Sequence, residues 1–204
     1  SSSSSSEDEC GDSDSAGGGA SWGEADGTGS VNYSDYNAWR PDALPDDLKK
    51  YAINPESVGM KFASGTGWQY PGNQCVNLTI SLIYAIWEKD GGHPTNPGGN
   101  GKDIAPGYAS QLGGSTSDTP HAGSAFSSDE APGYGHTGVV SHVFANGDAL
   151  IIEQNFAGKS GEQNGENCTW NYRYCTKSFL KAHSYSFFDP SSKGYKFVSG
   201  IKSK

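Results

Sequence analysis

Residues 75–88, CVNLTISLIYAIWE, carry the strongest structural signal in the chain. Several of these residues recur three or four positions apart, the spacing that places side chains on one face of an α-helix: Cys75, Leu78, Thr79, Leu82, Ile83 and Ile86. Further apolar residues widen that face, so we expect a largely buried helix. Gly91 and Gly92 follow it, as is typical of a helix end.

A hairpin is predicted downstream of this helix. Two apolar runs, residues 137–144 and 149–156, flank the dipeptide Asn146-Gly147. Asn-Gly between such runs favours a two-residue turn joining antiparallel strands. We therefore expect these two runs to pair directly.

The register of the hairpin follows from the turn. A two-residue turn places Val140 opposite Glu153 and Gly138 opposite Asn155. Alternate residues of a strand share a face, so His136 would project beside these four side chains. His136 would then be diagonal to Asn155 across the small Gly138, with Glu153 one pair further along.

The remaining segments predict an antiparallel sheet with short helices. Residues 43–51 and 103–112 favour short helices, the second within a loop-rich segment from 91 to 133. A further strand pair is expected from 167–174 and 182–188, and a last strand from 194–201. A helix followed by an antiparallel sheet defines an α+β fold.

Composition divides the 204-residue chain into two parts. Residues 1–30 are rich in Ser, Gly and acidic residues and cannot bury enough apolar surface to order themselves, so we expect a flexible linker. Residues 31–204 should form one domain. We expect the linker to tether this domain to another one.

The charge balance and hydropathy exclude two classes of partner. With 14 basic against 23 acidic residues, the net charge is −9, which argues against binding to nucleic acid. No apolar run reaches the length of about 18 residues that a membrane-spanning helix needs, so we expect no membrane insertion.

The cysteines and histidines do not have the spacing of a metal site. The sequence has no Cys-x2-Cys and no His-Glu-x-x-His, so we expect neither a metal nor a cofactor. Cys168 and Cys175 flank a predicted turn and would form a disulfide in an oxidising compartment. Cys10 lies in the linker without an obvious partner.

Cys75 is the candidate nucleophile because it opens the buried helix. The positive end of the helix dipole and unpaired N–H groups favour a thiolate there. His136 could serve as its base, held by Glu153 or Asn155. Alternatively, Cys75 is a small core residue and His136 a satisfied strand histidine; the joint placement of the four residues favours the catalytic interpretation.

Three short motifs resemble the CHAP domain, the cysteine- and histidine-dependent amidohydrolase/peptidase family. They are Asn73-Gln74-Cys75-Val76-Asn77, Gly135-His136-Thr137-Gly138-Val139-Val140 and Glu153-Gln154-Asn155. The resemblance spans roughly residues 63–201. It implies a papain-like fold, with the nucleophile helix packed on an antiparallel sheet, and cleavage of peptide or amide bonds in bacterial peptidoglycan.

The resemblance also implies roles for the four residues. Cys75 would be the nucleophile, His136 the general base and then acid, Glu153 the group that orients His136, and Asn155 an auxiliary polar residue. The family pattern thus favours Glu153 as the partner of His136, whereas the predicted register favours Asn155, and the two expectations conflict. Some family members carry an acidic calcium loop before the nucleophile, but residues 63–73 contain no Asp or Glu, so we expect no calcium there.

The implied chemistry needs an oxyanion hole and a groove for an extended substrate. The backbone N–H of Cys75 would be the first oxyanion donor, and Gln74 or Tyr70 the second. Trp68, Tyr70 and Tyr134 could line the groove.

Both an endopeptidase and an N-acetylmuramoyl-L-alanine amidase fit this machinery. Such a protein would act outside the cell or at its surface, as a secreted phage lysin or a conjugation-associated wall hydrolase does. The alternatives are a wall-binding module without catalysis and a cysteine peptidase that acts on protein.

Overall fold

The computed structural model describes residues 25–61, 66–156 and 170–198. Its α-helices are α3 (Asp46–Lys49), α4 (Cys75–Ile86), α5 (Ile104–Leu112) and α6 (Lys177–Ala182). Its strands are β1 (Ala38–Trp39), β2 (Trp87–Glu88), β3 (Ala125–Ser128), β4 (His136–Val143), β5 (Ala149–Gln154), β6 (Trp170–Cys175), β7 (Ser186–Phe188) and β8 (Lys196–Phe197). Short 3-10 helices are η1 (Pro41–Ala43), η2 (Pro55–Val58), η3 (Gly101–Asp103) and η4 (Pro190–Lys193).

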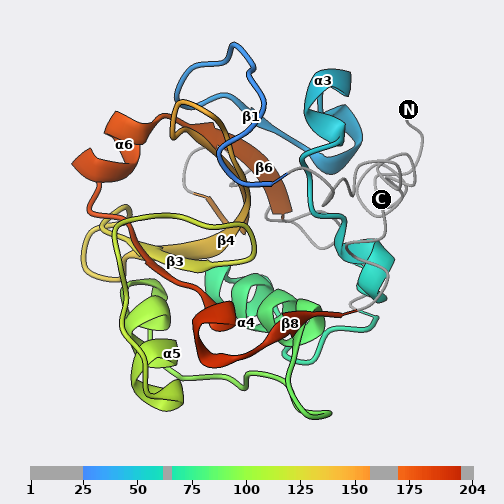
Figure 1. Ribbon diagram of the computed structural model, residues 1–204, viewed down its shortest axis with the longest axis vertical. Helices are drawn as coiled ribbons and strands as arrows, with labels where there is room; N and C mark the ends of the chain where they lie inside the picture. The colour runs from blue at the N-terminus through green and yellow to red at the C-terminus, as the bar shows by residue number, and fades with distance from the viewer. Residues whose placement is uncertain (1–24, 62–65, 157–169, 199–204) are drawn as a thin grey trace.

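A six-stranded antiparallel sheet forms the centre of the fold. Its strand order is β1-β6-β5-β4-β3-β7, and β2 and β8 form a separate pair. The buried side chains of α4 and α5 pack on one face of the sheet, and those of α6 pack on the other. Figure 1 shows α4 and α5 below the sheet and α6 above it. The α+β, papain-like fold expected from the sequence is confirmed.

Helix α4 forms where the apolar spacing predicted it, and its apolar face lies in the core. Leu78, Leu82 and Ile86 are fully buried against the sheet. The helix ends two residues earlier than predicted. Trp87 adopts an extended backbone and begins β2, whose pairing with β8 replaces the last predicted helical residues.

The hairpin forms, but the predicted register is wrong. Gly138 pairs with Glu153 rather than with Asn155. One residue of the shift comes from the turn, because the Phe144 N–H donates to the Asp148 carbonyl at 2.8 Å and leaves a three-residue loop. The other comes from a β-bulge between Val140 and His142.

The two shifts add to two residues, and this preserves the faces that the sequence predicted. Side chains alternate with a period of two, so His136, Gly138 and Val140 still share a face with Glu153. Beyond the bulge, His142 pairs with Leu150 and leaves that face. Its ring is buried.

Other predicted elements differ in length or partner. The first helix is only α3 with η1 before it, and β3 lies in the segment predicted to be loop-rich. The expected pairing of 167–174 with 182–188 is wrong, since β6 pairs with β1 and β5 while β7 pairs with β3. The Thr176 hydroxyl caps α6, which separates these two strands. The last predicted strand is reduced to β8 within the residues described.

The folded part begins within the segment predicted to be a linker. The Gly27 N–H donates to the Val143 carbonyl at 2.8 Å, and Asp26 accepts from the Ala122 N–H at 2.8 Å. The Thr28 carbonyl lies 2.9 Å from the His142 ring. Residues 1–24 of the predicted linker lie outside the described residues, so the linker and its tethering role stay predictions.

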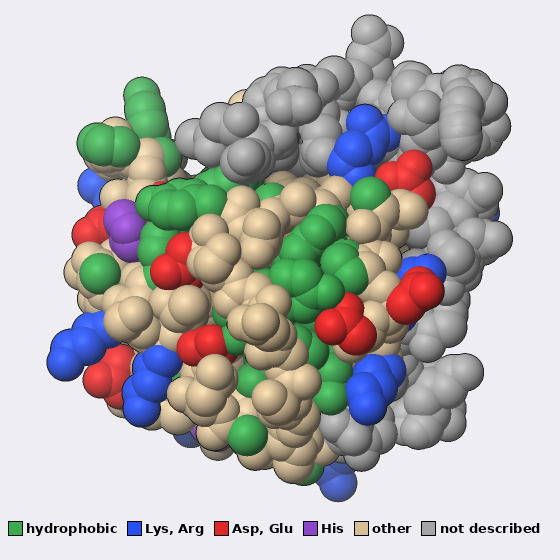
Figure 2. All heavy atoms as spheres, turned by 90° about the horizontal axis from the view of Figure 1, so that it is seen from above, with side chains coloured by type: hydrophobic (Ala, Val, Ile, Leu, Met, Phe, Trp, Pro, Cys, Tyr) green, Lys and Arg blue, Asp and Glu red, His purple; other side chains and the backbone are tan. Residues whose placement is uncertain are grey.

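Acidic and basic side chains are interspersed on the face shown in Figure 2, with apolar side chains gathered between them. Among the described helices, none has the length and hydropathy that crossing a membrane requires.

We predict that Gly101→Ala destabilises the fold at the site described below. A Cβ at Gly101 would lie 2.7–2.8 Å from the backbone atoms of His136, too close for η3 and β4 to keep their places. Overpacking of this kind costs about 1–3 kcal/mol of unfolding free energy, measurable by urea denaturation. In the control Gly92→Ala, the new Cβ meets only a carbonyl oxygen at 3.5 Å, and a loss as large as that of Gly101→Ala would contradict the steric argument.

Candidate active site

Cys75 is the first residue of α4 and lies partly exposed at the surface. Gln74 precedes it as the N-cap, and the Gln74 N–H donates to the Asn77 side-chain oxygen at 3.1 Å. The thiol therefore sits where unpaired helix N–H groups and the helix dipole favour negative charge.

His136 is the first residue of β4, and its side chain is hydrogen-bonded to Glu153 rather than to Asn155. The Nε2 atom of His136 lies 2.7 Å from Glu153 Oε1, and the two side chains are 4% and 0% exposed. Because Gly138 faces Glu153 in the observed register, His136 reaches Glu153 diagonally across a residue without a side chain. The two-residue shift thus places Glu153 where the sequence had placed Asn155.

The hydrogen bond to Glu153 also fixes which ring nitrogen of His136 faces the thiol. A carboxylate only accepts, so Nε2–H donates to it, and Nδ1 is left for Cys75. Burial acts to lower the pKa of His136, but hydrogen bonding to Cys75 and Glu153 and their negative charges outweigh burial and raise this pKa to about 9. The imidazole is therefore protonated at neutral pH, with its positive charge beside the Cys75 sulfur.

Arg173 holds Glu153 from the side away from His136. This fully buried arginine donates through Nε to Glu153 Oε2 at 2.7 Å and through a terminal nitrogen to Oε1 at 2.8 Å. The Asn171 amide adds a bond to Oε2 at 3.0 Å. Burial acts to raise the pKa of Glu153, but Arg173 and His136 outweigh burial and hold this pKa at about 2.

Further side chains enclose Arg173 on the side away from Glu153. The guanidinium donates to Glu130 at 2.9 Å and to the Tyr185 hydroxyl at 3.0 Å, and it stacks on the Phe156 ring with 3.9 Å to the ring centre. Phe156 also lies near the His136 ring. A chain of alternating charges thus runs from His136 through Glu153 and Arg173 to Glu130.

Arg173, Asn171 and Glu130 were not predicted from the sequence. The signal for the first two was present in residues 170–175, WNYRYC, where a polar residue alternates with aromatic ones. Alternation places Asn171 and Arg173 on one face, and the pairing of β6 with β5 brings that face to Glu153. Glu130 follows β3. Because this strand was not predicted from the sequence, the position of Glu130 near Arg173 was not predicted either.

Asn155 serves the nucleophile side of the site. It has a left-handed backbone with φ of 58°, a conformation that asparagine tolerates better than most residues. Its side-chain amide donates to Gln74 Oε1 at 3.1 Å. The Gln74 side chain is therefore held by its oxygen, which leaves its N–H groups to act as donors.

The three aromatic residues predicted to line a groove are placed differently from one another. Tyr134 is 69% exposed on the loop that leads into His136. Trp68 and Tyr70 are half-buried and pack against the core. The Tyr70 hydroxyl accepts from the Asn96 N–H at 3.3 Å. Tyr134 is thus the only one of the three to present most of its surface to solvent.

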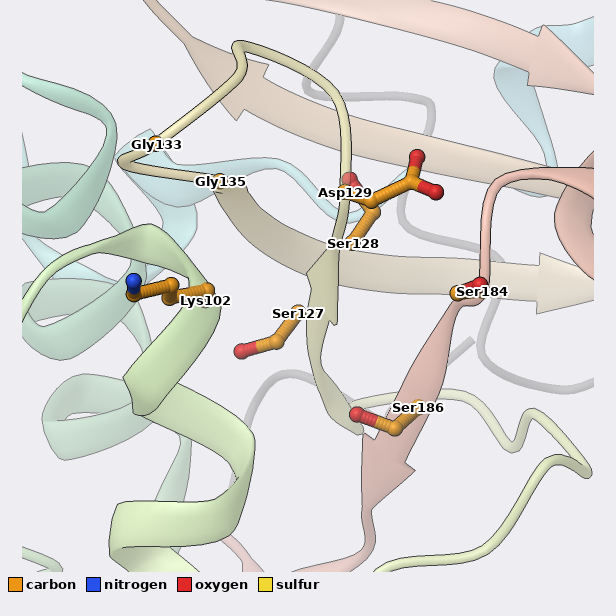
Figure 3. A pocket seen from close by; sticks show the side chains of 8 residues that line it. All are labelled: Lys102, Ser127, Ser128, Asp129, Gly133, Gly135, Ser184 and Ser186. Carbon is orange, nitrogen blue, oxygen red and sulfur yellow. The ribbon is translucent and has the colours of Figure 1, made fainter.

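A pocket of about 290 Å³ adjoins the start of β4. Gly135, which precedes His136, lines it, as does Ser128, which pairs with His136 in the sheet. Figure 3 shows the serines of β3 and β7 around the pocket, with Lys102 extending away from them.

Of the remaining cysteines, the structure describes only Cys175, which does not join the site. Cys175 is buried, and burial raises the pKa of its thiol to about 12. Cys168 lies outside the described residues, so the disulfide with Cys175 stays a prediction. In the described ranges, no three His, Cys, Asp or Glu side chains are grouped as metal ligands would be.

A thiol at a helix N-terminus beside a histidine held by a carboxylate defines the class of cysteine- and histidine-dependent hydrolases. Residues 65–155 match the family model of the CHAP domain. These residues therefore correspond to a CHAP domain, and the resemblance seen in the sequence is confirmed. This domain indicates a cysteine/histidine-dependent amidohydrolase/peptidase family. The search of curated proteins gives no match to the chain.

We predict that Arg173→Met strongly destabilises the protein. The substitution leaves Glu153 and Glu130 buried without their cation, which costs about 3–5 kcal/mol of unfolding free energy. The control Arg40→Met removes a half-exposed ion pair to Asp42 at 3.8 Å, for which we expect a loss below about 1 kcal/mol. Urea denaturation of both variants measures the difference, and equal losses would show that the buried network contributes little.

We predict that the His136 imidazole titrates near pH 9. Because its pKa is raised on folding, its contribution to stability is complete below the usual value of 6.5 and is lost as pH rises through about 9. NMR titration of the ring signals measures this directly. Glu153→Gln removes the neighbouring negative charge and should lower the pKa of His136. A wild-type value at or below 6.5 would contradict the geometry.

Proposed function

We propose that the protein hydrolyses an amide or peptide bond of bacterial peptidoglycan, with Cys75 as nucleophile, His136 as base and acid, and Glu153 as the residue that orients His136. The observation that carries the proposal is the buried pair of His136 and Glu153, 2.7 Å apart, with the ring interacting with Cys75 at the start of α4. The membership of residues 65–155 in the CHAP family supports the choice of substrate.

The first chemical step forms a thioester. The Cys75 thiolate attacks the carbonyl carbon, a C–S bond forms, and the carbonyl π electrons move to oxygen. As the intermediate collapses, the C–N bond breaks and His136 gives its Nδ1 proton to the leaving amine. Glu153 stays ionised throughout, because Arg173 keeps the pKa of this carboxyl low.

The second step releases the acid product. His136, now neutral, takes a proton from water as the water oxygen attacks the thioester carbon. The C–S bond breaks, and the thiolate is restored beside the imidazolium. Atoms balance as one water added across one amide bond.

Two donors are suited to the developing oxyanion. The Cys75 backbone N–H lies at the helix start, where no intrahelical carbonyl is available to it. The Gln74 side-chain amide is the second, because Asn155 holds its oxygen and leaves its N–H groups as donors. Asn155 is thus assigned to the oxyanion side of the site, and Glu153 to the base.

The surroundings of the site suit an extended polymer. Tyr134 is exposed on the loop that leads into His136, and a pocket lined by Gly135 adjoins the start of β4. We propose that the stem peptide or cross-bridge occupies this region. The protein would act at the cell surface or outside the cell, with the segment before Ala25 as a tether to another module, as in a phage lysin or a conjugation-associated wall hydrolase.

We predict that the wild-type protein releases new amino termini from purified peptidoglycan and that Cys75→Ala does not. Mass spectrometry of the released fragments measures this and identifies the bond, whether the N-acetylmuramoyl-L-alanine amide or a peptide bond. Removal of a nucleophile of this kind lowers the rate by a factor on the order of 10⁴ or more.

A matched variant separates the site from the fold. Ser192→Ala changes an exposed hydroxyl in η4, remote from Cys75, and should cleave as the wild type does. If the wild type releases nothing but sediments with the wall, the domain is a binding module. Cleavage of unfolded casein without cleavage of the wall would indicate a peptidase for protein.

A further inference from the structure

Gln154 is a buried residue near both parts of the site, the His136–Glu153 pair and the start of α4 at Cys75. It is the last residue of β5, next to Glu153, and its side chain is 0% exposed. Because strand residues alternate, Gln154 projects to the side of the sheet opposite Glu153. That is the side on which Ile152 and α4 form the core.

The Gln154 amide is bonded to the loop that leads into the nucleophile. Its Nε2 donates to the Gln74 carbonyl at 2.7 Å and to the Gly72 carbonyl at 3.1 Å. One nitrogen with two N–H groups thus joins both carbonyls. The loop is closely packed here, since a Cβ at Gly72 would lie 2.4 Å from the Asn77 side chain.

The Gln74 carbonyl belongs to the same peptide group as the Cys75 N–H. A peptide group is planar, so fixing the direction of its oxygen fixes the direction of its N–H on the other side. The Asn77 N–H also donates to this oxygen, at 3.1 Å. Hydrogen bonds to the oxygen polarise the group and make its N–H a stronger donor.

We propose that Gln154 is a positioning residue for the oxyanion hole: by binding the Gln74 carbonyl, it orients and polarises the peptide group whose N–H, that of Cys75, stabilises the oxyanion. The inference rests on the proposed nucleophile and oxyanion donor. It assigns a separate task to the last two residues of β5 and to the residue that follows, with Glu153 serving the base, Gln154 the backbone donor and Asn155 the side-chain donor.

The test compares two reactions of Cys75 in the full chain. Acylation by p-nitrophenyl acetate passes through an oxyanion, whereas alkylation by iodoacetamide displaces iodide without one. Peptide mass spectrometry follows Cys75 separately from Cys10, Cys168 and Cys175. In Gln154→Met, which keeps the side-chain length and removes both donors, we expect the acylation rate to fall by about 10- to 100-fold while alkylation stays within about twofold.

The control is Gln111→Met on α5. It removes an exposed side-chain amide that donates a hydrogen bond to the Thr95 hydroxyl, and it should leave both rates unchanged. A second variant, Gln154→Glu, keeps the shape of the side chain but turns a carboxylate toward the two carbonyls, and its acylation should fall at least as far. Thermal melting verifies that each variant folds.

Three other results would overturn the assignment of Gln154 as a positioning residue. Unchanged acylation in Gln154→Met would show that the peptide group needs no support. An equal loss of acylation and alkylation would show that Gln154 holds the thiol itself. If neither variant melts cooperatively, Gln154 is a folding residue. The test uses p-nitrophenyl acetate in place of peptidoglycan, so it does not depend on the wall as substrate. If the ester acylates Cys75 of the wild type but the wild type leaves the wall intact, the proposed function alone is refuted.

Discussion

The ion pair between Arg173 and Glu153 is the interaction on which the site depends. Both side chains are fully buried, so each charge has lost its water and must be compensated by protein groups. Arg173 does this for Glu153 with two short bonds, and Glu153 can then remain anionic beside His136. Without the guanidinium, burial would favour a neutral carboxyl, and a neutral carboxyl would not stabilise the imidazolium.

The same ion pair ties the site to the sheet. Glu153 is on β5, Arg173 on β6 and His136 on β4, so the charges link three neighbouring strands across one face. Glu130, after β3, extends the link to a fourth strand. Rigid strands position side chains more precisely than loops do, so the three strands hold the His136 ring in place beside the thiol at the start of α4.

The sequence predicted the helix at Cys75, the hairpin and the face shared by His136 and Glu153, because these depend on local periodicity. It did not predict which strand pairs with β6, since strand order is set by packing between distant segments. The partner of His136 was also undetermined, because the turn and the bulge each move the register by one residue. Arg173 was visible only as an unexplained polar residue in an aromatic strand. Its importance appears only when β5 lies beside it.

Because of the bulge in β4, the number of residues in the hairpin loop, odd or even, decides which face of the sheet each side chain of β5 occupies. Ser141, at the bulge, accepts a hydrogen bond from the Ile53 N–H at 3.2 Å, so the extra residue is anchored to a distant segment. Loss of one residue from the loop alone would slide β5 by one position and turn Glu153 to the side of α4, leaving Arg173 and His136 facing apolar side chains. The bulge and the three-residue loop therefore compensate for each other, and a change in one is tolerable only with a compensating change in the other.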